Sequence, residues 1–189
     1  WGITFITTPT HSTIDHCIIE YANTGVSANH ANFTLSNSIV RWSTGANVYL
    51  LYSSPNITHN RLYENSHGII ELGRYSNPTI TYNTMWGSTA GGIFSTDYSH
   101  PIIRHNIIRN CSGGIGIMNF GAATIEYNTI TGCELGIEVR ERTQPSEVAI
   151  KYNNVYGNEN VNVQTDSTLT DDVDATNNWW GTTDKTQIE

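Results

Sequence analysis

The chain has 189 residues, a length that suits one domain with a substantial core. Charged residues make up only 14%, while Asn, Thr, Ser, Gly, Ile and Tyr are plentiful, which is typical of β-rich proteins and not of helical or disordered ones. The formal net charge is −8, no basic stripe occurs, and no apolar run is long enough for a membrane span, so we expect neither a nucleic-acid partner nor a membrane-spanning segment.

The start of the chain, Trp1-Gly2-Ile3-Thr4-Phe5, indicates a strand and contains neither a Met nor a signal peptide. We therefore read the chain as a mature or excised piece of a longer protein. Asn-X-Ser/Thr sequons begin at Asn32, Asn56 and Asn110, and they favour an extracellular or cell-surface glycoprotein.

A repeat of 21 to 25 residues then governs the sequence, visible in segments such as "PTITYNTMWG" and "ATIEYNTITG". One aliphatic residue stands three positions before a polar residue, and another stands two positions after it. The polar column reads Cys17, Ser38, Asn60, Asn83, Asn106, Asn128, Asn153 and Asn178. A unit this short cannot bury its own apolar face, so the repeat predicts a solenoid.

Two solenoid classes have repeats of this length. Leucine-rich repeats need several leucines per unit, and this chain has few. Its short β-branched segments, separated by Gly, Asn and Pro, favour a parallel β-helix with three strands per coil. We expect about eight coils stacked in a single all-β domain over residues 1–189.

The polar column marks a bend. In Ile80-Thr81-Tyr82-Asn83-Thr84-Met85, both Ile80 and Met85 must point inward, and strict alternation forbids this unless the chain turns at Tyr82 and Asn83. Tyr82 belongs to a column rich in Asn, His and Tyr, which suits a left-handed backbone. The Asn side chains then turn inward and form a structural ladder, predicted for Asn60, Asn83, Asn106, Asn128, Asn153 and Asn178.

Cys17, Cys111 and Cys133 are an odd number, so no complete disulfide framework is implied. Cys111 and Cys133 follow the ladder by five residues on adjacent coils, where either a disulfide or two buried thiols would fit. We expect thiols. No closely spaced Cys/His set predicts a metal site, and the acidic tail, with Asp166 and Asp174, lacks a recognised calcium-loop spacing, although Ca²⁺ remains an open alternative.

An aromatic column stands eight residues before the ladder, in the most variable loop: Tyr52, Tyr75, Tyr98 and Phe120. Spaced one coil apart, these rings would form a strip suited to stacking against sugars. The alternative is that the rings only stack on one another over a corner of the coil. Both interpretations stay open.

The "TIxYNTI" rows and the "GI" strand starts, over residues 12–163, resemble the right-handed parallel β-helix repeats of the pectate-lyase-like superfamily. The likeness is to its surface and secreted proteins of archaea and bacteria. The segment "NNWWGTTD" is similar to the end of such helices, so residues 177–189 are expected to begin a C-terminal cap. The resemblance implies a right-handed coil. It does not choose among lyase, hydrolase and non-catalytic members.

In the enzymes of this superfamily, the resemblance implies acidic residues and a base on the outer face of the "GI" strand. Alternation puts an outward row at Ser27, Tyr49, Ile70, Phe94, Gly116, Glu138 and Asn162. Glu138 is the only carboxylate in that row. Glu71 falls in an inward slot, so either a bulge turns it outward, which we expect, or it is a buried acid with a raised pKa.

Two looser clusters are the candidate catalytic sites. The first contains Glu71, Arg74, Asp97 and His100, and the second contains Glu138, Arg140, Glu141 and Arg142. Neither has a recognised motif. We therefore expect a rigid extracellular module with a structural or carbohydrate-contacting role. A polysaccharide lyase or glycoside hydrolase is the alternative, and a filament or sheath subunit stacking end to end is a further one.

Overall fold

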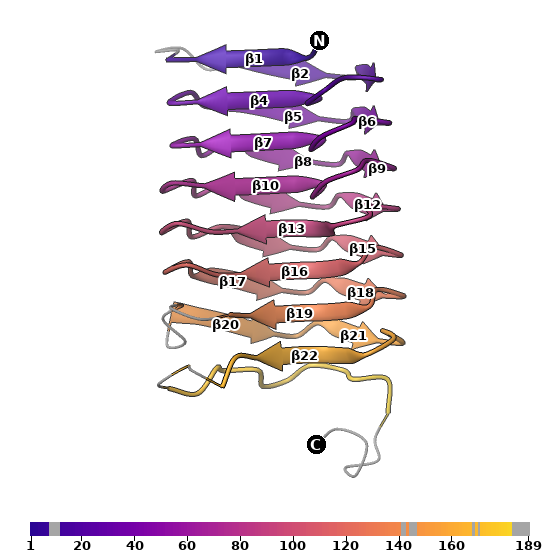
Figure 1. Ribbon diagram of the computed structural model, residues 1–189, viewed down its shortest axis with the longest axis vertical. Helices are drawn as coiled ribbons and strands as arrows, with labels where there is room; N and C mark the ends of the chain where they lie inside the picture. Colours follow the sequence, from indigo (N-terminus) through magenta and orange to yellow (C-terminus); the bar gives the residue numbers. More distant parts are fainter. Residues whose placement is uncertain (8–11, 141–142, 144–146, 168, 170, 183–189) are drawn as a thin grey trace.

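The computed structural model describes residues 1–7, 12–140, 143, 147–167, 169 and 171–182. The chain winds into a rod of stacked coils, with β1 near one end and β22 near the other (Figure 1). Every strand pairs in parallel with its counterparts in the neighbouring coils, which creates three sheets along the rod. The structure is therefore the predicted all-β parallel β-helix.

The strands are short and are distributed over three sheets. Sheet A contains β1 (Ile3–Ile6), β4 (Val26–Asn29), β7 (Val48–Leu51), β10 (Ile70–Gly73), β13 (Gly91–Ser95), β16 (Gly113–Ile117), β19 (Leu135–Val139) and β22 (Val161–Thr165). Sheet B contains β2 (Ser12–Asp15), β5 (Phe33–Ser36), β8 (Asn56–Thr58), β11 (Thr79–Thr81), β14 (Ile102–Arg104), β17 (Ala123–Glu126) and β20 (Val148–Lys151). Sheet C contains β3 (Ile18–Glu20), β6 (Ile39–Arg41), β9 (Arg61–Tyr63), β12 (Thr84–Trp86), β15 (Ile107–Arg109), β18 (Thr129–Thr131) and β21 (Asn154–Tyr156).

The eighth row of the repeat continues the stacking beyond these sheets in a reduced form. Asp174 forms an isolated parallel bridge with Ala149, and Trp179 forms one with Asn154. The described part of the predicted cap segment thus still follows the register of the coil before it. Residues 183–189 lie outside the described residues.

The interior of the rod is built from the two predicted aliphatic columns. Ile57, Ile80 and Ile103 lie in register on sheet B, and Leu62 and Met85 do so on sheet C, all with no exposed surface. Each side chain is thus covered by its equivalents above and below. Stacking buries an apolar face that one coil alone would leave in water.

The Asn ladder occupies the bend between sheets B and C, as predicted. Asn83 Nδ2 donates to Asn106 Oδ1 at 3.1 Å and to the carbonyl oxygen of Ile57 at 2.8 Å, and the same Asn106 oxygen accepts from the Asn83 backbone N–H at 2.9 Å. The rung-to-rung bonds run from Asn60 to Asn178. These bonds satisfy backbone groups that the bend removes from the strand ladders.

Each coil turns at left-handed residues. At the bend before the ladder, φ is between 49° and 62° at His16, Asn37, His59, Tyr82, His105, Tyr127, Tyr152 and Asn177, as the sequence predicted. The aromatic column is left-handed too, at Tyr52, Tyr75, Tyr98 and Phe120, which sequence reasoning did not foresee. Left-handed backbone is unfavourable for residues with a side chain, so the fold has to compensate at these corners.

The predicted alternation of inward and outward residues in β10 was wrong. Ile70 aligns with Val48 and Ile93 and is fully buried, whereas Glu71 aligns with Phe94 on the outer face. The pairing of β10 with both neighbours is continuous, so no bulge is needed to turn Glu71 outward. Aligned on the "GI" strand starts of the sequence, Gly68 would match Gly92. The structure matches Ile69 to that position, and a shift of one residue reverses every side chain.

The outward position in β22 was also assigned wrongly, in this case by two residues. Glu138 pairs with Gln164, so Gln164 takes the outward position that the sequence had assigned to Asn162. Asn162 instead accepts a hydrogen bond from Asn158 at 2.9 Å in the adjoining corner.

Candidate functional site

A shallow hollow of about 330 Å³ lies on the outer face of sheet A and its following loops. Tyr49, Glu71 and Phe94 reach it from the same outward register position of β7, β10 and β13. Arg74 and Asp97 come from the left-handed turns that follow β10 and β13. The hollow therefore combines two aromatic rings with two carboxylates and one guanidinium group.

Glycines determine how the Phe94 ring lies. A Cβ at Gly91 would come within 2.6 Å of Phe94 Cζ, and a Cβ at Gly116 within 2.8 Å of Phe94 Cδ1. The ring thus occupies the space above these two glycines and lies across the sheet. Phe94 is half-buried, so part of its ring stays exposed for a stacking ligand.

The polar groups of the hollow are held by short local bonds. Glu71 Oε1 accepts from the backbone N–H of Gly68 at 2.8 Å, and the Glu71 side chain is 27% exposed. Thr96 Oγ1 donates to Asp97 Oδ1 at 3.0 Å. Both carboxylates are therefore positioned and reachable, and Glu71 is not the buried acid of the alternative hypothesis.

The predicted aromatic column runs beside the hollow. Its ring centroids are 6.4 Å apart for Tyr52 and Tyr75, 5.2 Å for Tyr75 and Tyr98, and 5.0 Å for Tyr98 and Phe120, all stacked. The rings are 37% to 58% exposed. Because each ring face meets the next ring, the column mainly presents edges and phenolic hydroxyls to solvent.

A second stacked column stands at the ladder bend and was not predicted as such. It contains His59, Tyr82, His105, Tyr127 and Tyr152, with centroids 4.8 to 5.2 Å apart and interplanar angles of 4° to 15°. The sequence signal was present, since these are the residues before the ladder. They were interpreted only as turn formers. Ring stacking is a stabilising contact that offsets their left-handed backbone.

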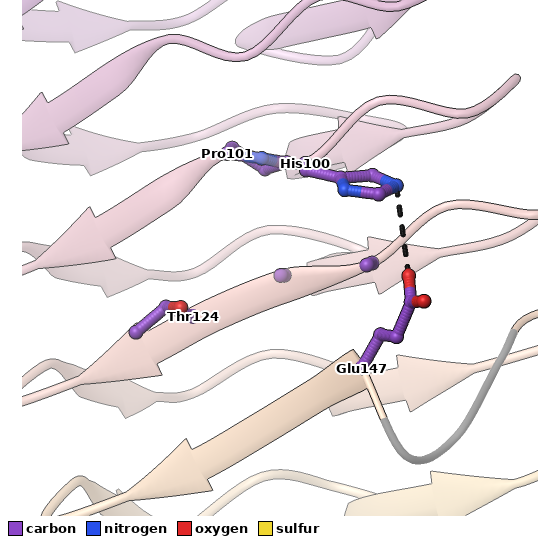
Figure 2. Close-up of a pocket in the computed structure, with 6 residues that line it drawn as sticks. His100, Pro101, Thr124 and Glu147 are labelled. Carbon is purple, nitrogen blue, oxygen red and sulfur yellow. Dashed lines mark ion pairs between the residues drawn. The ribbon is translucent and has the colours of Figure 1, made fainter.

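His100 lies apart from the other members of its predicted cluster. It lines a separate hollow of about 360 Å³ with Pro101, Thr124 and Glu147, and Figure 2 shows His100 and Glu147 pointing toward each other. His100 Nε2 and Glu147 Oε2 are 3.9 Å apart, and both side chains are 48% exposed. The structure thus brings Glu71, Arg74 and Asp97 together in one hollow. It pairs His100 with Glu147, which the sequence did not single out.

Glu138 does not complete a carboxylate pair with Glu71. The outward row between them passes through Phe94 and Gly116, so they are three coils apart, or roughly 14 Å at the strand spacing. Glu138 accepts from Arg140 Nε at 2.8 Å. Glu141 and Arg142, the rest of that predicted cluster, lie outside the described residues.

Within the described residues, no three His, Cys, Asp or Glu side chains gather in a way that could hold a metal ion. Asp174 of the acidic tail forms an ion pair with Lys151, with its Oδ2 atom 2.6 Å from Lys151 Nζ. In the same part of the chain, no helix is long and apolar enough to cross a membrane.

The three cysteines are free, and Cys111 and Cys133 are buried. The thiols donate to the carbonyl oxygens of Arg109 and Thr131. A hydrogen bond with Cys133, together with burial, raises the pKa of the Cys111 thiol, which keeps it protonated at neutral pH.

The three sequon asparagines, Asn32, Asn56 and Asn110, are exposed. Asn32 Oδ1 accepts from the backbone N–H of Ser54 at 2.6 Å, and Asn56 stands on the outer face of β8. All three side chains are thus open to solvent, which a glycosylation site requires.

The coil geometry and the repeated Asn bend define a right-handed β-helix protein. Residues 1–148 match the family model described as right handed beta helix region, which covers most of the chain. The chain belongs to this family, which confirms the predicted kinship with right-handed parallel β-helix repeat proteins. No curated protein and no solved structure gives a significant match.

Proposed function

We propose that the chain is a glycan-contacting module of an extracellular or cell-surface protein. Its β-helix is a rigid repeat module. The hollow on sheet A would be the contact site. The exposed sequons at Asn32, Asn56 and Asn110 support the proposed location.

One observation carries the proposal: the ring of Phe94 lies across glycines beside Tyr49, Glu71, Asp97 and Arg74. Sugar rings bind to aromatic faces, while carboxylates and guanidinium groups hydrogen-bond the surrounding hydroxyls. The aromatic column of Tyr52, Tyr75, Tyr98 and Phe120 would extend this contact along the rod through its edges and hydroxyls.

Glycoside hydrolysis is the second candidate function. Glu71 and Asp97 line the same hollow, and two carboxylates are the minimal set for that reaction. In such an enzyme one carboxylic acid protonates the leaving oxygen and the other carboxylate acts as base or nucleophile. His100 and Glu147 form a separate polar pair that this mechanism does not use.

Affinity gel electrophoresis against a panel of neutral and acidic polysaccharides tests the proposal. We expect retardation in one or more of the neutral gels, and its loss there in Phe94→Ala. Trp179→Ala is the matched control and should be retarded like the parent chain. Trp179 is an exposed aromatic residue that pairs with Asn154 of β21, several coils from the hollow at β7, β10 and β13. Retardation by neutral polysaccharides that survives Phe94→Ala, or none in any neutral gel, would contradict the proposed site.

The same panel, incubated with the chain and assayed for reducing ends, separates binding from hydrolysis. Reducing ends that disappear in both Glu71→Gln and Asp97→Asn would establish the hydrolase. Retardation without product would establish a binding module. Unsaturated products would instead indicate a lyase reaction, and Ca²⁺ should be both present and absent in parallel assays.

A further inference from the structure

Among the residues that the structure describes, three Arg side chains have no carboxylate partner. The other described Arg and Lys side chains, Arg41, Arg104, Arg140 and Lys151, each form an ion pair with a carboxylate. Arg61, Arg74 and Arg109 form none within the same part of the chain. Arg74 belongs to the hollow on sheet A. Arg61 and Arg109 lie together elsewhere, on the outer face of sheet C.

Both of these guanidinium groups gather around one indole. The Cζ atoms of Arg61 and Arg109 are 5.5 Å and 5.4 Å from the centroid of Trp86, within the range of cation–π attraction. Tyr63 stacks on Trp86 with centroids 4.1 Å apart and an interplanar angle of 8°. Trp86 is thus in contact with a neighbouring ring and two cations, and Tyr63 is almost fully buried beneath them.

The guanidinium edges of Arg61 and Arg109 remain available for a ligand. A guanidinium that approaches a ring uses its face, so its in-plane N–H donors still point outward. Arg41, on the same face, shows the contrast. Its Nε and Nη2 bond Glu20 at 2.8 Å and 2.7 Å, and its Nη1 bonds Tyr63 Oη at 2.9 Å. Arg61 and Arg109 are both exposed and form no such bonds with other described residues.

The nearby carboxylates are already engaged. Glu20 is held by Arg41, and Glu64 accepts from Trp42 Nε1 at 2.5 Å. Because neither Arg61 nor Arg109 is paired with a carboxylate of the described residues, the two guanidinium groups can attract anions even on a chain with net charge −8. Planar guanidinium edges bind anionic oxygens in pairs, which gives such a site geometric selectivity.

The spacing of the two cations indicates an extended ligand. Arg61 and Arg109 belong to β9 and β15, with β12 between them, so their strands are roughly 10 Å apart. One small anion cannot pair fully with both guanidinium groups, and a single exposed ion pair contributes little. A chain with an anionic group on successive units can engage both at once and gains from that multivalency.

We propose that the outer face of sheet C around Trp86 binds an anionic polysaccharide, with Arg61 and Arg109 each pairing with one of its carboxylate or sulfate groups. Single-stranded nucleic acid fits less well, because bases need free aromatic faces and Trp86 is already stacked. This surface lies on a different sheet from the hollow of the proposed function and shares no residue with it, so either can fail alone.

Binding to three polymers with one backbone tests the proposal: dextran, carboxymethyl-dextran and dextran sulfate, measured by calorimetry at two salt concentrations. We expect binding to the charged polymers, weakening with salt, and none to dextran. The variant Arg61→Gln/Arg109→Gln should bind at least 10-fold more weakly. The control Arg104→Gln/Arg140→Gln removes the same charge from other faces and should stay within 2-fold of the parent chain.

The two charged polymers distinguish the sources of the anion, since preference for one identifies carboxylate or sulfate as the group recognised. Circular dichroism of both double variants checks that the fold is intact. Several results would overturn the proposal: no binding to either charged polymer, equal losses in the two double variants, or equal affinity for single-stranded oligothymidylate. Phe94→Ala should leave this binding unchanged, which separates it from the hollow on sheet A.

Discussion

Asn106 illustrates how much one ladder side chain satisfies. Its Nδ2 donates to the carbonyl oxygens of Ile80 and Arg104 and to Asn128 Oδ1, and its Oδ1 accepts from the Asn83 backbone and side chain. An apolar residue here would leave several buried groups without partners. The ladder therefore stabilises the bend through hydrogen bonds, whereas the aliphatic columns on either side stabilise it by burying apolar surface.

Replacing Asn106 by Ala should destabilise the rod strongly. Each buried backbone group left unpaired costs about 1–3 kcal/mol, so we expect a loss of about 3 kcal/mol or more. Urea denaturation followed by circular dichroism measures it. Asn154→Ala, at an exposed position, is the control and should stay within about 0.5 kcal/mol of the parent chain. A loss below about 1 kcal/mol in Asn106→Ala would show that the ladder is dispensable.

Asp15 should titrate unusually low. Hydrogen bonds from Ser36, Asn37 and His16 hold the pKa of this carboxyl at about 2, below its ordinary 3.8. Because the folded pKa is the lower one, ionised Asp15 stabilises the fold above about pH 4, and this contribution disappears as the pH falls toward 2. Carbon-13 NMR titration of the carboxyl measures the pKa, and Ser36→Ala should raise it. An ordinary pKa in the parent chain would exclude these bonds.

At the scale of single residues, the sequence predicted what repeats and missed what depends on neighbours. The Asn ladder and its left-handed partners follow from identity and spacing alone. The partner of His100 did not, because Glu147 stands two coils away at the end of the most variable loop. The orientation of Phe94 depends on Gly91 and Gly116, which carry no pattern of their own.

Among the elements, β10 shows the limit of pattern reading. The segment between the ladder residue and this strand varies in length from coil to coil, and both Ile69 and Ile70 are apolar. Either phase therefore looked acceptable, and the glycine at Gly68 suggested the wrong one. Only the pairing of Ile70 with Val48 and Ile93 decides the phase, and it moves Glu71 into the hollow. Strands with one apolar residue per inward position, such as β11, were predicted in the right phase.

In β16, two adjacent glycines should respond very differently to a methyl group. A Cβ at Gly114 would lie 2.2 Å from the carbonyl oxygen of Gly136 and 2.7 Å from Ile130 Cγ2, whereas at Gly113 the nearest atom is 3.7 Å away. Gly114→Ala should cost about 2–3 kcal/mol or more, because backbone must move. Gly113→Ala should be neutral or stabilise by up to about 1 kcal/mol.

Urea denaturation of the two variants side by side provides the comparison, since their chemistry is identical. Equal effects would mean that the coil containing Gly114 and its neighbours can shift without penalty, contrary to the tight stacking of β16 and β19. A stable Gly114→Ala chain should then show a displaced β19 by NMR.

Over the whole molecule, each coil contacts only its neighbours, so stability should vary along the rod. Residues of β13 are mostly buried, whereas those of β22 are half-buried or exposed. We expect backbone amides of β13 to exchange with solvent far more slowly than those of β22. Hydrogen exchange followed by NMR measures both. Uniform rates along the rod would indicate a single cooperative unit.

The constant geometry of the bend has a consequence for how such a chain can change in length. The sequence distance from ladder Asn to the next sheet C strand is the same from coil to coil, and only the other corners vary. Excision of residues 80–102 would bring Ile103 to the place of Ile80, with Asn106 succeeding Asn60 and Ile108 facing Leu62. Duplication would do the reverse. Heritable growth and shrinkage in whole coils thus require no newly designed core, which makes the reach of the rod an evolvable quantity separate from what its faces bind.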